Sequence, residues 1–241
     1  MPARGRLSQV LRPLLDLLVP PACWSCRGPV NAGSALCPGC AFDLPWVQPP
    51  QVRSPGGTGR QCRTDGSRTD GSPAPPGTSI TTTATPLTLT GPARDLVHAL
   101  KFRSAPAVAA LMAAHVVHAL PAGFFDPRAT IVAVPAHPGR RRRRGYDHAD
   151  LLARAIAART GQPVAVALAR AGGRSAHQRG AGRADRLRGG GLSVTARGPA
   201  PARCLLVDDV RTTGATLEAC AAALAGSGAR RVDAVAYAQA P

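Results

Sequence analysis

Hydrophobic residues along the C-terminal two thirds of the chain follow two spacings that take turns. Short apolar runs bounded by turn residues predict buried strands, and apolar residues three and four positions apart predict helices. We expect strands at residues 131–134, 164–166, 204–207 and 231–237. We expect helices at residues 92–102, 106–119, 146–159 and 214–226. Strands that alternate with helices predict an α/β fold, in which helices flank a parallel sheet.

The N-terminal third is patterned differently. Residues 5–19 place leucines on one side of a short amphipathic helix, which we expect to pack on the rest of the protein, with membrane-surface binding as the alternative. Residues 48–79 are crowded with Pro, Gly, Ser, Thr and Arg, which is typical of a flexible linker. The chain therefore divides into an N-terminal unit at 1–47, a linker at 48–79 and the α/β domain at 80–241.

The composition fits this division and adds a strong positive charge. Of the 241 residues, 44% are hydrophobic, which is enough for a packed core, and the net charge is +17. Such a charge indicates a polyanionic partner, either a nucleic acid, an anionic membrane or a phosphorylated small molecule. Lys101 is the only lysine, so the charge is almost entirely arginine, and the codon usage of a GC-rich genome explains part of it. Aromatic residues make up only 3%, which leaves few rings for stacking on bases.

No segment predicts a membrane span, because none reaches the roughly 18 consecutive apolar residues that a spanning helix needs. The apolar run near the N-terminus is interrupted by Asp16, and no small-x-small cleavage site follows it, so we do not expect a signal peptide. We therefore expect a cytoplasmic protein.

Four of the seven cysteines form two Cys-x-x-Cys pairs, and ten residues separate the pairs. They are Cys23, Cys26, Cys37 and Cys40. Four thiolates in two close pairs suit tetrahedral Zn2+, and a closed shell of four protein ligands makes the metal structural. The alternative is a redox Cys-x-x-Cys site. The sequence predicts a small N-terminal zinc knuckle, and we expect the other three cysteines not to bind metal.

The most informative segment runs from Leu205 to Leu217, where an apolar strand is followed by Asp208, Asp209 and a Thr-rich loop that leads into a helix. Carboxylates at the end of the strand can accept hydrogen bonds from vicinal ribose hydroxyls. The loop precedes a helix N-terminus, whose unpaired N–H groups bind anions, and Gly214 allows a phosphate to approach the backbone closely. The alternative is an ordinary strand-to-helix turn with an Asp cap. No Gly-Lys-Ser/Thr ending is present, so the segment is not a Walker A loop.

A second anion site is predicted after the strand at 131–134, where five consecutive arginines occupy positions 140–144. Guanidinium groups bind phosphate oxygens in a bidentate manner, so such a run suits a phosphate or pyrophosphate group. Arg140, Arg144 and the adjoining Gly145 are the candidates, with Arg144 the strongest. A solvated basic loop or a nucleic-acid patch is the alternative.

The segment at 205–217 resembles the phosphoribosyl pyrophosphate (PRPP) motif of type I phosphoribosyltransferases. The resemblance implies a fold of that type, in which Asp208 and Asp209 hold the ribose 2- and 3-hydroxyls as the catalytic acids. It also implies that the loop after them cradles the 5-phosphate, and that Mg2+ accompanies PRPP. The loop residues are Val210, Arg211, Thr212, Thr213, Gly214, Ala215 and Thr216.

The whole chain resembles the ComF family, in which the same motifs occur in the same order. These are the cysteine pairs at 23–40, His-Ala-Leu-Lys-Phe at 98–102, Val-Pro followed by Arg-Gly-Tyr at 134–146, and the PRPP motif. Asp147 and His148 stand where that family usually has Asn and Gln.

The long Arg- and Gly-rich stretch at 170–191 is typical of a functional or disordered loop. Type I phosphoribosyltransferases close such a loop over PRPP, and the ComF resemblance implies that Arg170, Gln178 and Arg186 take part.

Three functions stay open at this point. The first is transfer of a phosphoribosyl group from PRPP to a nitrogen base, with Mg2+ between the pyrophosphate and ribose oxygens. The second is a module that senses PRPP or a nucleotide without turnover. The third, implied by the link of ComF proteins to natural competence, is a DNA-uptake accessory protein that binds single-stranded DNA, a helicase or other competence proteins.

Overall fold

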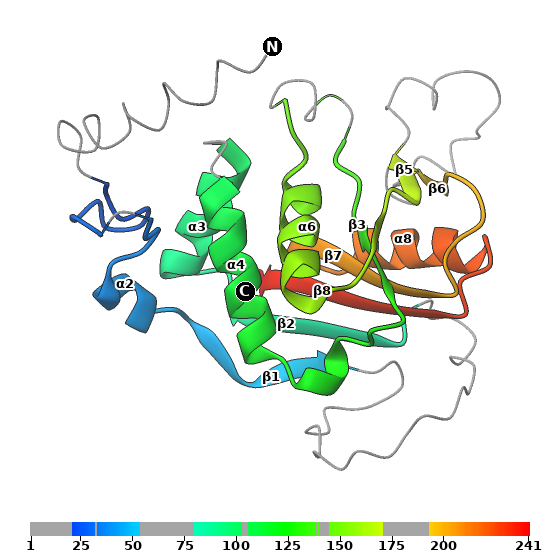
Figure 1. Ribbon diagram of the computed structural model, residues 1–241, viewed down its shortest axis with the longest axis horizontal. Coiled ribbons are helices and arrows are strands. Elements are labelled where there is room, and N and C mark those ends of the chain that lie inside the picture. Colours follow the sequence, from blue (N-terminus) through cyan, green and yellow to red (C-terminus); the bar gives the residue numbers. More distant parts are fainter. Residues whose placement is uncertain are drawn as a thin grey trace.

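The structure is a computed structural model of the chain, and it describes residues 21–31, 33–53, 80–102, 106–137, 139, 145–170 and 193–241 (Figure 1). The helix predicted at 5–19 lies outside these ranges, as do most of the predicted linker, the five arginines and nearly all of the 170–191 loop.

A six-stranded sheet forms the centre of the molecule, with the strand order β1-β2-β8-β7-β3-β4 (Figure 1). The strands are β1 (Trp46–Arg53), β2 (Thr82–Thr88), β3 (Thr130–Ala133), β4 (Val164–Ala165), β7 (Arg203–Arg211) and β8 (Arg231–Gln239). All neighbouring pairs are parallel except β1 and β2, which are antiparallel. The expected α/β fold with a mainly parallel sheet is therefore confirmed.

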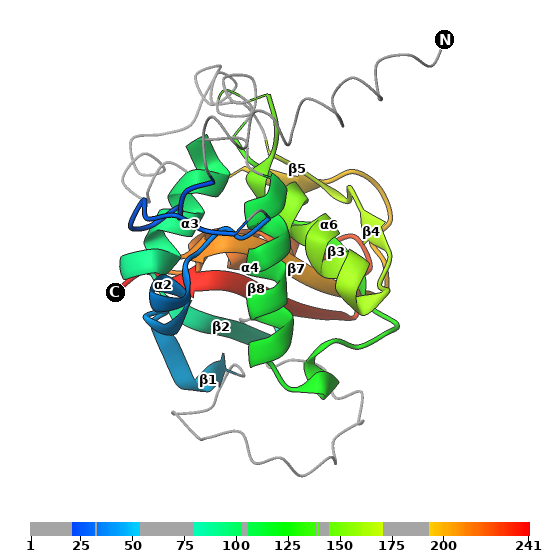
Figure 2. The ribbon, with the colours of Figure 1, turned by 60° about the vertical axis from the view of Figure 1, so that its left-hand side comes forward.

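Helices cover both faces of this sheet (Figure 2). They are α3 (Gly91–Phe102), α4 (Pro106–Ala119), α6 (His148–Thr160) and α8 (Ala215–Ala225), and a short 3-10 turn, η1 (Ala122–Phe124), precedes β3. Two core clusters show which helix covers which face. Successive side chains of β7 point to opposite faces of the sheet. Leu205 belongs to the cluster that contains residues of α3, α4 and α6, and Leu206 belongs to the cluster that contains Leu217 and Leu224 of α8.

Two strands that the pattern did not predict complete the sheet on one side. β2 reads Thr-Thr-Ala-Thr-Pro-Leu-Thr, so its apolar residues are few, although four consecutive positions of it are buried. β1 contains two prolines and an irregularity between Trp46 and Gln51, as proline in an edge strand allows. Residues 48–53, which composition assigned to the linker, belong to β1, because pairing with β2 stabilises an extended backbone that the sequence alone does not favour.

A second, two-stranded antiparallel sheet is formed by β5 (Leu168–Arg170) and β6 (Val194–Ala196). The predicted 170–191 loop joins these two strands, and Arg170 itself is the last residue of β5.

The N-terminal cysteine region packs directly against the α/β domain. Cys23, Leu36 and Leu44 are buried in the same core cluster as Leu96 and Leu100 of α3. The hydroxyl of Ser25 donates a hydrogen bond of 2.7 Å to Oδ2 of Asp95, also on α3. The two parts of the chain therefore share one core.

Among the described residues, we find no helix that combines the length and the apolar character needed to cross a membrane.

Candidate functional site

The acid pair lies where β7 extends beyond its neighbour β3. Ala133, the last residue of β3, pairs with Val207, and β7 continues from there to Arg211 alongside β8. Asp208 and Asp209 therefore stand just past the carboxyl end of β3, at the edge of a parallel sheet where ligands bind.

Asp209 is 3% exposed and faces side chains from two helices. Its Oδ2 lies 2.8 Å from Nζ of Lys101, on the last turn of α3. Its Oδ1 lies 3.7 Å from Nε2 of His148, the first residue of α6. Neither contact could be predicted from the sequence, because the three residues are far apart along the chain. The signals at Lys101 are that the arginine-rich chain has a single lysine and that this lysine lies in the His-Ala-Leu-Lys-Phe segment at 98–102.

Asp208 is half-buried, and its Oδ1 accepts a hydrogen bond of 2.8 Å from the backbone N–H of Asp209. Burial raises the pKa of Asp208 well above its usual range, and the neighbouring Asp209 carboxylate raises it further. Two adjoining carboxylates face one lysine, so the site favours a ligand that brings hydroxyl donors or positive charge.

The predicted phosphate loop connects this acid pair to α8. Val210 and Arg211 still belong to β7, whereas Ala215 and Thr216 open the helix. Gly214 has a φ of 86°, in the left-handed region that favours glycine. The loop side chains Thr212 and Thr213 are exposed at this helix N-terminus, where backbone N–H groups lack helical partners.

The second predicted anion site is only partly within the described residues. Arg140 to Arg144, Gln178 and Arg186 lie outside them. Gly145 has a φ of 77°, which requires glycine at the turn before α6. The next residue, Tyr146, donates a hydrogen bond of 2.7 Å from its hydroxyl to the carbonyl of Leu100.

Asp147 stabilises the local fold, because its carboxylate accepts two hydrogen bonds from the backbone. Its Oδ1 accepts from the N–H of Ala149, which caps α6, and its Oδ2 accepts from the N–H of Ala136 in the loop after β3. One carboxylate therefore fixes the loop after β3 to the start of α6, and it positions His148 beside Asp209.

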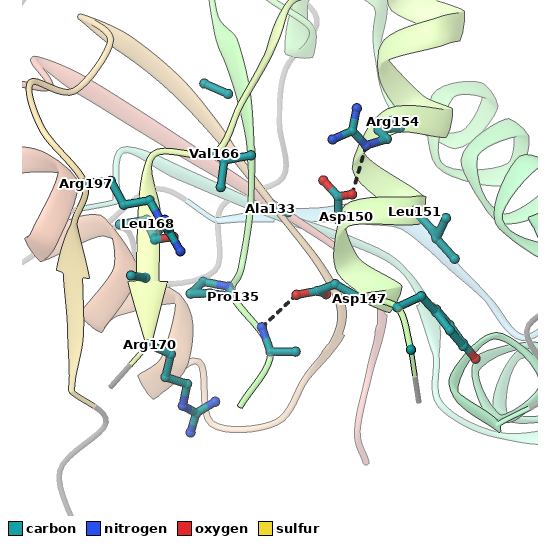
Figure 3. Close-up of a pocket in the computed structure, with 15 residues that line it drawn as sticks. Ala133, Pro135, Asp147, Asp150, Leu151, Arg154, Val166, Leu168, Arg170 and Arg197 are labelled. Atoms are coloured by element: carbon teal, nitrogen blue, oxygen red, sulfur yellow. Dashed lines mark hydrogen bonds and ion pairs between the residues drawn. The ribbon is translucent and has the colours of Figure 1, made fainter. Parts of the chain in front are cut away.

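A pocket of about 780 Å³ lies between β5 and α6, and Gly145 and Arg170 are among the residues that line it (Figure 3). Arg197 lies on the same wall of the pocket as Arg170. Its Nε donates a hydrogen bond of 3.1 Å to the carbonyl of Leu168. Asp150 stands on the opposite wall, where it is paired with Arg154 at 2.9 Å (Figure 3). The pocket adjoins the loop after β3, and none of its lining residues comes from Asp208 to Thr216.

The four predicted zinc ligands are brought together, with one sulfur atom of each within 4.8 Å of the others. Backbone N–H groups point at three of the sulfurs, from Gly28 to Cys26, from Cys37 to Cys23 and from Cys40 to Cys37, each at 3.4 Å. Hydrogen bonds of this kind stabilise thiolates.

This arrangement shifts the pKa values of Cys23 and Cys40 in opposite directions. Burial opposes charge on Cys23, but hydrogen bonds with the backbone of Cys37, Cys26 and Ser25 outweigh it and lower its pKa to about 6. Burial and hydrogen bonds with other thiols of the group raise the pKa of Cys40 to about 12. Four thiolates so close together at neutral pH would need a cation between them, which a zinc ion would supply.

Comparison with known families gives one match. Residues 14–54 match the double zinc ribbon domain. The match contains all four clustered cysteines, which supports a structural zinc at this position.

No curated protein matches the sequence significantly. Among solved structures, the chain is similar to one described as the structure of the allosteric regulatory enzyme of purine biosynthesis, with 17% identity and a TM-score of 0.39. The similarity covers 58% of this chain and 30% of the other, so this chain spans less than a third of that enzyme. A similarity of this size decides nothing about function.

Proposed function

We propose that the chain binds PRPP, or a nucleotide with a 5-phosphate, at the junction of β7 and α8. The observation that carries this proposal is the order of groups at one sheet edge. The half-buried Asp208, the buried Asp209, the exposed Thr212 and Thr213 and the left-handed Gly214 follow one another into the N-terminus of α8.

Each part of the ligand has a matching part of the site. The 5-phosphate would accept hydrogen bonds from the N–H groups at the start of α8 and from the hydroxyls of Thr212, Thr213 and Thr216. The ribose 2- and 3-hydroxyls would donate to Asp208 and Asp209. Mg2+, bound with PRPP, would supply positive charge to the pyrophosphate and ribose oxygens.

The reaction that such a site supports is transfer of the phosphoribosyl group. In that reaction the bond between the anomeric carbon and the pyrophosphate oxygen breaks, a bond to a nitrogen of the acceptor base forms, and pyrophosphate leaves. Charge then grows on the pyrophosphate oxygens, and Arg170 at the end of β5, together with the arginines that follow β3 in the sequence, would stabilise it. A module that senses PRPP would bind it at the same site with neither bond change.

The test of binding is isothermal titration calorimetry of the full chain with PRPP and Mg2+, compared with ribose 5-phosphate and with pyrophosphate alone. The proposal expects PRPP to bind more tightly than either fragment, because it engages both halves of the site. Equal binding of PRPP and pyrophosphate would show that the ribose and 5-phosphate parts of the site are not used. Release of pyrophosphate with one member of a panel of bases would then identify an enzyme, and binding without release would identify a sensor.

The net charge of +17 favours a second candidate, an accessory protein for DNA uptake that binds single-stranded DNA. Binding through phosphate contacts would fall with salt, with a log–log slope of about −0.7 per phosphate neutralised. Competition by PRPP and Mg2+ would place the DNA on the arginines of the pyrophosphate site, and absence of competition would place it elsewhere. Failure to bind DNA at low ionic strength would remove this candidate.

A further inference from the structure

Three side chains at the sheet edge meet in a way that no sequence motif predicts. His148 opens α6, and Asp208 and Asp209 end the buried part of β7. One donor atom from each, an imidazole nitrogen and two carboxylate oxygens, lies within 4.8 Å of the other two. The group is mixed in chemistry and comes from two elements, α6 and β7, and the Asp147 cap fixes the start of α6 to the loop after β3.

Because this group is buried, water compensates its charges poorly, and a nearby cation has to balance them. The Asp209 side chain is 4% exposed and that of His148 is 13% exposed, so both are largely removed from water. Oδ2 of Asp209 is buried, and among the described residues its partner is the Lys101 ammonium at 2.8 Å. A buried carboxylate is costly unless a cation compensates it.

Lys101 is the cation present, and it is the more exposed partner. Its side chain is 25% exposed and lies on the last turn of α3, so its ammonium group can turn towards solvent. A compact ammonium that neutralises one of two adjoining carboxylates occupies the place of a more highly charged cation.

We propose that His148, Asp208 and Asp209 directly bind one divalent transition-metal ion of the Mn2+ class, and that the Lys101 ammonium takes its place when the metal is absent. Carboxylates suit Mg2+ and Mn2+ alike, whereas an imidazole ligand favours the transition metal. Three donor atoms that share one ion at metal–ligand bonds of about 2.0–2.2 Å lie roughly 3–3.8 Å apart. The donor atoms of these side chains lie within 4.8 Å of one another, so the side chains need to close by about 1 Å or more to bind one ion. The site stands on these three residues and needs no PRPP. Each carboxylate keeps a second oxygen, so the metal is also compatible with a sugar ligand there.

The experiment titrates Mn2+ into the full-length, zinc-loaded chain without PRPP, with free Mn2+ measured by its EPR signal. Mn2+ is the weakest divalent competitor for nitrogen and sulfur ligands, so it leaves zinc in the knuckle. We expect one saturable Mn2+ site, for which Mg2+ competes weakly. Pulsed EPR of the bound ion should show coupling to an imidazole 14N nucleus.

Two variants and one control assign the ligands. His148→Gln should weaken Mn2+ binding by at least about tenfold, because loss of a group that only supports a ligand already costs about that much affinity. The same variant should abolish the 14N coupling. His118→Gln, at an exposed position of α4, should leave both unchanged. Lys101→Met should strengthen Mn2+ binding, because it removes the competing ammonium.

The proposal is overturned if the wild-type chain has no saturable Mn2+ site, if bound Mn2+ shows no 14N coupling, or if His148→Gln retains the coupling. Should His148→Gln fail to fold, the 14N signal of the wild-type chain and the Lys101→Met titration decide the question. Because no PRPP is present, these outcomes are independent of whether PRPP binds.

Discussion

The conformation of Gly214 links the end of β7 to the proposed phosphate site. Its φ of 86° lies in a region that costs an L-residue about 1–2 kcal/mol. A Cβ added there would also lie 3.2 Å from Nε of Arg211. A glycine at this point therefore serves both the turn and the close approach of a ligand to the backbone.

Gly214→Ala should accordingly lower the free energy of unfolding by about 1 kcal/mol and weaken PRPP binding more than it weakens stability. Chemical denaturation and calorimetry measure the two effects. The control is Gly123→Ala, at a position in η1 where a Cβ meets no atom within 4 Å and φ is not left-handed. Equal effects of the two substitutions would contradict a special role for Gly214.

Asp147 makes a second prediction at the scale of one residue. Asp147→Ala removes the α6 cap and the hydrogen bond to Ala136, so the free energy of unfolding should fall by about 1–2 kcal/mol. Asp150→Ala is the matched control, since the exposed Asp150–Arg154 pair contributes only about 0.3–0.5 kcal/mol. A ligand role for Asp147 instead of a capping role would show as lost PRPP affinity with unchanged stability in denaturation experiments.

At the scale of elements, the sequence predicted most of the architecture. The strands at β3, β7 and β8 and all four long helices follow from apolar spacing, because each buries a face whose residues are apolar. β1 and β2 escaped prediction, since Thr-rich and Pro-containing segments become strands only through pairing with β8 and with each other. The contact of Asp209 with Lys101 and His148 escaped for a different reason, because it depends on how α3 and α6 pack against β7.

The zinc knuckle packs on the α/β domain, although the sequence predicts a flexible linker between the two. A flexible linker would mean that removal of zinc unfolds the knuckle alone. In the structure, Cys23, Leu36 and Leu44 belong to the core that α3 and β2 share. The knuckle and the α/β domain should therefore be coupled in stability.

Removal of zinc by a chelator should lower the melting temperature of the whole chain, because structural zinc contributes roughly 10–16 kcal/mol of apparent binding energy. Circular dichroism of the sheet and helix signal measures this, and addition of excess zinc should restore the original value. An unchanged melting temperature of the α/β domain after complete zinc loss would contradict the shared core.

At the scale of the whole molecule, an aromatic group joins α4 to two strands of the six-stranded sheet. Nδ1 of His115, on α4, lies 3.0 Å from the hydroxyl of Tyr237 on β8, and its ring packs edge-to-face on Trp46 of β1. Burial, with the positive charges of His118 and Arg159, lowers the pKa of His115 to about 4. The histidine is therefore neutral in the folded protein at physiological pH.

This lowered pKa predicts how stability depends on pH. Between the unfolded value of about 6.5 and the folded value of about 4, the unfolded chain binds more protons than the folded one, so the free energy of unfolding falls as the pH falls. The loss between pH 7 and pH 5 should be on the order of 1 kcal/mol. His115→Asn should remove it, whereas His98→Asn, at an exposed position of α3, should keep the wild-type slope in denaturation at each pH. The same slope in wild type and His115→Asn would contradict this assignment.

The central claim is that the acid pair on β7 binds the ribose of a phosphoribosyl ligand, and the most direct test is calorimetric affinity for PRPP with Mg2+ in the Asp208→Ala, Asp209→Ala double variant. Removal of two carboxylates reduces repulsion of a polyanion, so a fall in affinity would come from lost acceptors for the ribose hydroxyls or from loss of a metal that the same carboxylates hold. With at least about 1.5 kcal/mol per charge-assisted hydrogen bond, the loss should be on the order of 3 kcal/mol, more than a hundredfold in Kd. The Asp43→Ala variant, at an exposed position after the cysteine pairs, should bind as the wild-type chain does. Unchanged or tighter PRPP binding by the folded, zinc-loaded double variant would contradict the account.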